Sequence, residues 1–149
     1  HFYDTGKIKT TSIVSYGMRH IVGLDNEHSF FKLWTNKKKK TLRKNRSVLG
    51  KYVDHCVSEI NMFLGGFKVA LPAEMWPTDR KISRALTTTT INGLIFCLRL
   101  LIEKDALGTF DYYRARFSNM QVSFRAAEFA YKSSHWKSLG EELFKECFE

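Results

Sequence analysis

Residues 47–66, SVLGKYVDHCVSEINMFLGG, contain the clearest helical pattern in the chain. Their apolar side chains recur at steps of three and four residues, as they do along one face of an α-helix. This stripe consists of Leu49, Val53, Cys56, Val57, Ile60, Phe63 and Leu64. The opposite face is polar and carries Lys51, Asp54, His55, Ser58 and Glu59. Ser47 is a favourable N-cap and Gly65–Gly66 a favourable end, so the pattern predicts an amphipathic helix between them.

The sequence on either side predicts more helices and no convincing strand. Thr10 or Thr11 is expected to cap a short helix that ends near Gly23. Residues 81–104 predict a helix, with a break near Thr87, and its apolar centre marks it as central to the fold. The threonine run at 87–90 is expected at the N-terminus of a helix, because β-branched residues are poor helix formers but threonine can cap. Shorter helices are expected over residues 110–120 and 122–131, and a final one after Ser133 or Ser134.

These patterns predict a mainly α fold, a single compact bundle of five or six helices with a basic loop. The 149 residues fit one domain, and the high content of Phe, Tyr and Trp excludes a wholly disordered chain. Because the chain begins at His1 and not at Met, we expect a fragment of a longer protein or a processed chain. Residues 1–11 are polar and are expected to be extended or poorly ordered. Three cysteines without close spacing indicate buried, reduced thiols in a cytoplasmic protein.

The excess positive charge is concentrated in one place. The chain has 24 basic and 15 acidic residues, and residues 37–46, KKKKTLRKNR, hold seven of the basic ones and no acid. The rest of the chain therefore carries 17 basic against 15 acidic residues and is nearly neutral. Lys and Arg neutralise phosphates, so this basic segment (residues 37–46) predicts binding to nucleic acid, with DNA expected first. The residues expected at the contact are Lys37, Lys38, Lys39, Lys40, Arg43, Lys44 and Arg46, with Trp34 beside them to stack on bases.

Other interpretations of these residues stay open. The basic segment could be a solvated loop or a nuclear-localisation signal, and Trp34 is more readily a core anchor of the apolar knot at 30–34. Five further basic residues, Arg80, Lys81, Arg84, Arg114 and Arg116, would extend the same surface if they lay beside the basic segment. Scattered, solvated charges are the favoured interpretation of those five.

The sequence contains no recognisable catalytic centre. His55 and Glu59 share a helix face, which we interpret as ordinary surface pairing. No CxxC or HxxxH pair occurs, and neither a phosphate loop nor a GxSxG nucleophile motif is present. We therefore expect no metal and no cofactor, and whether the parent protein is an enzyme stays open. The longest uncharged run, residues 85–98, is 14 residues and too short to span a bilayer, so no membrane association is expected.

Three local features occur in an order and spacing that resemble a known family. Trp76 precedes Leu86-Thr87-Thr88-Thr89-Thr90-Ile91-Asn92-Gly93, then comes Phe110-Asp111-Tyr112-Tyr113, and finally Tyr131-Lys132-Ser133-Ser134-His135-Trp136-Lys137. Over roughly residues 47–148 the chain resembles the helical C-terminal part of DGQHR-domain proteins, the group that includes DndB-like proteins of DNA phosphorothioation systems.

The resemblance implies a prokaryotic, DNA-associated protein tied to DNA modification, its regulation or phage defence. The Asp-Gly-Gln-His-Arg motif itself is absent, so no catalytic residue is carried over. The matching residues are expected to be structural, as caps, a close helix approach and core anchors: Trp76, Thr87, Thr88, Gly93 and Trp136. Possible assemblies are a homo-oligomer or a larger defence complex. The alternatives are a protein-interaction or assembly domain with a merely solvated basic loop, and an enzyme fragment whose catalytic half lies upstream.

Overall fold

The computed structural model describes residues 8–24, 29–34 and 39–149, and of Lys39 the backbone alone. Within these ranges the chain is mainly helical, as predicted, and contains no strand beyond an isolated bridge between Ser83 and Arg125. The α-helices are α1 Thr10–Ile13, α2 Arg19–Val22, α3 Phe30–Leu33, α4 Lys39–Lys44, α5 Arg46–Ala70, α6 Thr88–Glu103, α7 Phe110–Phe117 and α8 Trp136–Phe148. A π-helical turn, Val14–Met18, joins α1 to α2, and short 3-10 turns lie at Ala73–Met75 and Ser133–His135.

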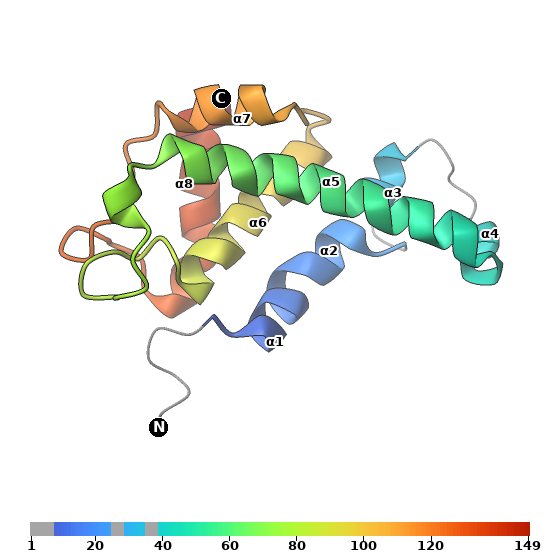
Figure 1. The fold of residues 1–149 in the computed structure, drawn as a ribbon, viewed down its shortest axis with the longest axis horizontal. Helices are drawn as coiled ribbons and strands as arrows, with labels where there is room; N and C mark the ends of the chain where they lie inside the picture. The colour runs from blue at the N-terminus through green and yellow to red at the C-terminus, as the bar shows by residue number, and fades with distance from the viewer. Residues whose placement is uncertain (1–7, 25–28, 35–38) are drawn as a thin grey trace.

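Helix α5 is the longest element and runs across the whole molecule (Figure 1). Its cap is Asn45, whose side chain accepts hydrogen bonds from the backbone N–H groups of Ser47 and Val48, so the predicted Ser47 cap is two residues too late. The predicted end at Gly65–Gly66 is also wrong. The helix continues to Ala70 and stops before Pro72, since a proline disfavours helical backbone in the residue before it.

The buried face of α5 differs from the predicted stripe in the N-terminal half of the helix. Its buried residues are Tyr52, Cys56, Phe63, Gly66 and Phe67. Leu49, Val53 and Val57 remain 41–50% exposed. The aromatic rings of Phe31 and Trp34 pack against Tyr52, which directs the Tyr52 side of the helix inward. Its hydroxyl also donates a hydrogen bond to the Val22 carbonyl over 2.8 Å, which ties α5 to α2.

Helices α6 and α8 form the centre of the bundle and approach each other at two glycines. A Cβ on Gly140 would lie 2.6 Å from the Gly93 carbonyl oxygen, and one on Gly93 would lie 2.8 Å from the Leu139 side chain. The expected close helix approach at Gly93 is therefore confirmed. The threonine run also lies where it was predicted, since Thr87 caps α6 by accepting from the Thr90 N–H.

The structure corrects several further predictions. Residues 81–87 and 122–131 are not helical, because they pair with each other: the Arg84 N–H donates to Phe124, and the Ala126 N–H donates to Ile82. The first and last helices form as predicted but without the predicted threonine or serine caps. The basic segment is not entirely a loop, since residues 39–44 form α4. Residues 1–11 were expected to be extended or poorly ordered. Residues 1–7 lie outside the described residues, whereas Thr10 and Thr11 are helical.

Candidate nucleic-acid interface

The described part of the basic segment is a short helix held by a single buried side chain. Leu42 is only 1% exposed and fixes α4 against the core. The adjoining cations Lys40, Arg43, Lys44 and Arg46 are all exposed. One apolar anchor therefore holds α4 in place while its charged side chains stay on the surface. Lys37 and Lys38 lie outside the described residues, as does the side chain of Lys39.

Asn45 forms the corner between α4 and α5. Its N–H donates to the Thr41 carbonyl and its own carbonyl accepts from the Leu49 N–H, so one residue closes α4 and opens α5. The first turn of α5 contains no acidic residue. The positive end of the α5 dipole and the cations around it therefore act in the same direction, which is an arrangement that favours anions.

Trp34 is half-buried, and its ring packs against Tyr52 with the centroids 5.2 Å apart. The neighbouring Phe30 and Phe31 are buried. The aromatic knot at 30–34 therefore anchors the chain before the basic segment to α5, and Trp34 contributes to that anchor. Any stacking on a base would use the part of the Trp34 ring that remains exposed.

The other basic residues do not extend the basic segment. Arg80, Lys81 and Arg84 lie in the connection from α5 to α6, at the opposite end of α5 from α4 (Figure 1). Helix α5 has 25 residues. At 1.5 Å of rise per residue this places the two ends about 37 Å apart. Two separate positive regions result, not one continuous surface.

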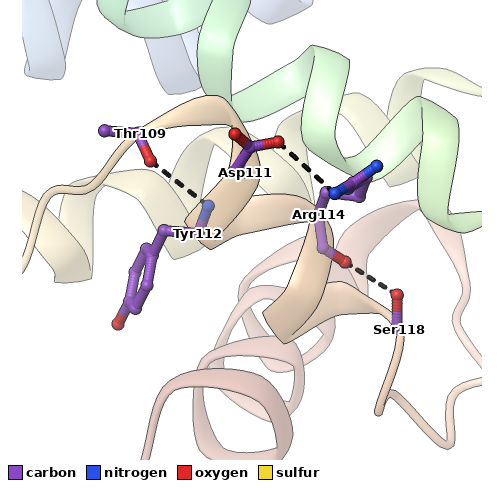
Figure 2. A network of polar contacts seen from close by, with 5 residues as sticks. All are labelled: Thr109, Asp111, Tyr112, Arg114 and Ser118. Atoms are coloured by element: carbon purple, nitrogen blue, oxygen red, sulfur yellow. Dashed lines mark hydrogen bonds and ion pairs between the residues drawn. The ribbon is translucent and has the colours of Figure 1, made fainter.

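Helix α7, which carries Arg114 and Arg116, packs along the C-terminal half of α5. Figure 2 shows how local contacts hold it: Thr109 caps the Tyr112 N–H, and Ser118 Oγ donates to the Arg114 carbonyl over 2.8 Å. Arg114 lies 3.4 Å from the Asp111 carboxylate, so its charge is partly compensated. Arg116 lies over the Tyr112 ring at 5.4 Å. Both arginines therefore have partners within α7 itself.

A further cationic cluster, which the sequence pattern missed, surrounds His20. Burial lowers the pKa of His20, and the positive charges of Arg99, Arg19 and Lys137 lower it further. These residues come from α2, α6 and α8, so only the packing of the three helices brings them together. Two of them lie over aromatic rings: Arg99 is 5.9 Å from the Phe96 ring and Lys137 is 5.4 Å from the Trp136 ring. No run in the sequence marks this cluster, because its members are far apart along the chain.

The remaining polar candidates have structural explanations. His55 stacks edge-on against Phe30, and burial raises the pKa of Glu59, with the His55 charge acting in the opposite direction. Across the residues that the structure describes, no group of three His, Cys, Asp or Glu side chains could hold a metal ion. The three cysteines are free and buried, as predicted, and burial raises the pKa of the Cys147 thiol to about 12. A thiol with such a pKa is unreactive at neutral pH.

Within the described ranges, no helix has both the length and the apolar character needed to cross a membrane.

Comparisons with known proteins found no relative of this chain. No family model, curated protein or solved structure gives a significant match.

Proposed function

We propose that this chain is a helical DNA-binding module that contacts phosphates through the basic segment. The observation that carries this proposal is the geometry of α4, in which a single buried leucine, Leu42, holds a short helix whose described cations are exposed. Such a surface releases counterions from a phosphate backbone when it binds, which gives affinity without sequence preference. The rest of the chain, being nearly neutral, acts as the scaffold.

The biological setting follows from the resemblance to the C-terminal part of DGQHR-domain, DndB-like proteins. On that basis we propose a cytoplasmic, prokaryotic protein that takes part in DNA modification, its regulation or phage defence. The module would bring the DNA to a partner. No reaction is assigned to the described residues.

The test is a binding titration with labelled duplex DNA and two variants of equal net charge. The first replaces Lys40, Arg43, Lys44 and Arg46 with glutamine, and the second does the same to Lys68, Lys81, Arg114 and Arg116. All eight side chains are exposed, so both variants should fold. We expect the first variant to bind at least about tenfold more weakly than the wild type and the second to bind almost as well. Equal loss in both variants, or loss in the second alone, would refute the assignment to the basic segment.

A second candidate function, assembly, is favoured by one specific observation. The exposed residues Leu49, Val53 and Val57 lie one turn apart on α5 and line an apolar groove of about 390 Å³. Helices pair through stripes of this kind, and we infer that a second copy of the chain would be the occupant. An antiparallel pairing of two α5 helices would keep the two positively charged N-terminal ends apart.

Light scattering coupled to gel filtration tests this assembly. A wild-type dimer that becomes a monomer on Val53→Glu would support it, because the charge would have to be buried in the interface. Ser58→Glu, which adds the same single negative charge at an exposed position of α5 outside the groove lining, is the matched control. A wild-type protein that is monomeric at high concentration would contradict the assembly.

A further inference from the structure

A polar cavity of about 560 Å³ lies where the start of the described chain meets the beginnings of α6 and α8. Its volume is typical of small-molecule sites. Among the described residues, the lining contains two cations, five hydroxyl side chains from serine and threonine, an amide and two aromatic rings, and no carboxylate: Lys9, Ser12, Tyr16, Arg80, Thr88, Thr89, Asn92, Ser133, Ser134 and Trp136. This composition favours an anionic ligand over a cationic one.

The N-terminus of α6 provides a second attraction for an anion. Thr88 and Thr89, the first two residues of this 16-residue helix, line the cavity. The first N–H groups of a helix have no intrahelical partner, and they carry the positive end of the helix dipole. Arg80 adds a full positive charge to the same wall. A phosphate group fits this combination of donors and charge.

Asn92 supplies an independent sign that a ligand belongs here. It lines the cavity and is only 2% exposed. Its Nδ2 donates to Ser12 Oγ over 3.2 Å, whereas its Oδ1 is buried without a hydrogen-bond partner among the described residues. Buried side-chain oxygens in folded proteins are nearly always hydrogen-bonded, since leaving one unpaired is unfavourable. A ligand that donates an N–H or O–H to this oxygen would satisfy it.

Tyr16 supplies a flat apolar surface at the same cavity. Its side chain is 56% exposed, although its ring lies only 5.9 Å from that of Trp136. Both residues line the cavity. An exposed aromatic ring next to a positively charged pocket is the arrangement on which nucleobases stack. The ligand is therefore expected to combine an anionic end with a planar ring.

We propose that this cavity binds a nucleoside phosphate. The phosphate lies against the first turn of α6 and Arg80, the base stacks on Tyr16, and a hydroxyl or amino group donates to Asn92. The site is separate from the basic segment and does not depend on the proposed DNA contact there. The ligand has two possible sources, a free nucleotide or a nucleotide within a strand, and both present the same chemistry.

Isothermal titration calorimetry with the four ribonucleoside monophosphates, the corresponding nucleosides and inorganic phosphate tests the site. At least one monophosphate is expected to bind more tightly than its nucleoside and than phosphate. Arg80→Gln should weaken that binding about tenfold, as expected for loss of a charged hydrogen bond. Tyr16→Ala should weaken the monophosphate about tenfold and leave inorganic phosphate unchanged, because only the base stacks.

Two controls separate this site from the basic segment. Arg114→Gln, on α7, and the glutamine variant of Lys40, Arg43, Lys44 and Arg46 should both bind the monophosphate as well as the wild type does. Displacement of the bound monophosphate by a short oligonucleotide would assign the ligand to a strand, and failure to displace it would assign a free nucleotide. The proposal is overturned if no monophosphate binds at millimolar concentration, or if Arg80→Gln binds as tightly as the wild type. Loss of binding in the basic-segment variant would overturn it as well.

Discussion

At the scale of single residues, the ends of the helices depend on local chemistry that the sequence shows only in part. Thr87 is a cap that the threonine run predicts, whereas the cap of α5 is Asn45 and not the equally suitable Ser47. The choice between them depends on where α4 ends, which the sequence does not mark. The first and last helices begin without side-chain caps, so the threonines and serines near their starts do not act as the caps that the sequence predicts.

Asp105 follows α6 with a φ of 52°, in the left-handed region that favours glycine. Its acidic side chain also lies near the negative end of the α6 dipole. We expect Asp105→Gly to raise the free energy of unfolding by about 0.5–1 kcal/mol, measured by urea denaturation. Asp111→Gly is the matched control and should lower the free energy of unfolding, because Asp111 has helical backbone in the first turn of α7. A destabilised Asp105→Gly protein would contradict this explanation.

His20 should make the stability of the fold depend on pH. Because burial and the charges of Arg99, Arg19 and Lys137 lower its pKa, the unfolded chain takes up a proton at a higher pH than the folded protein does. The folded state is therefore disfavoured as the pH falls below the ordinary histidine pKa of about 6.5.

We expect the His20→Gln variant to lose less stability between pH 7 and pH 5 than the wild type does, as measured by thermal unfolding. The exposed His135 provides the control, since His135→Gln should keep the full wild-type loss. Parallel pH profiles for the wild type and His20→Gln would show that the cationic cluster does not act on this histidine.

At the scale of elements, the periodicity of the sequence predicts which segments are helical better than it predicts how they pack. The central helix and the close approach at Gly93 could be predicted, because an apolar run and a glycine leave traces in the sequence. The exposed stripe at Leu49, Val53 and Val57 could not, because the rings of the knot at 30–34 decide which face of α5 is buried. The helix predicted over residues 122–131 is wrong because this segment pairs with residues 81–87, which are distant in sequence.

Two glycines in α5 should respond in opposite ways to alanine. A Cβ at Gly50 would meet no atom within 4 Å, so Gly50→Ala should raise the free energy of unfolding by about 0.5–1 kcal/mol through helix propensity. A Cβ at Gly66 would lie 2.6 Å from the Tyr113 Cβ and 2.9 Å from the Arg114 nitrogen. Gly66→Ala should therefore lower stability by about 1–3 kcal/mol, by separating α5 from α7. Chemical denaturation measures both, and a neutral Gly66→Ala would contradict the close packing.

At the scale of the whole molecule, the charge is arranged in a way that the sequence shows incompletely. The basic segment stands out as a run, and its described cations are exposed on α4. The cluster around His20 and the polar cavity at α6 are invisible in the sequence, because the residues of each are far apart along the chain and meet only in the folded protein. Positions 80, 81 and 84 carry cations at the opposite end of α5, so they do not extend the basic segment into one surface, which was the less favoured interpretation of the sequence (Figure 1).

The most direct test of phosphate binding through the basic segment is the salt dependence of DNA affinity. The affinity of the wild type for duplex DNA would be measured at several salt concentrations, beside the variant with glutamine at Lys40, Arg43, Lys44 and Arg46. Each phosphate contact contributes about 0.9 to the slope of log affinity against log salt concentration, so a variant that loses four contacts should lose about 3.6 units of slope. An identical slope and affinity in the two proteins would contradict the proposed function.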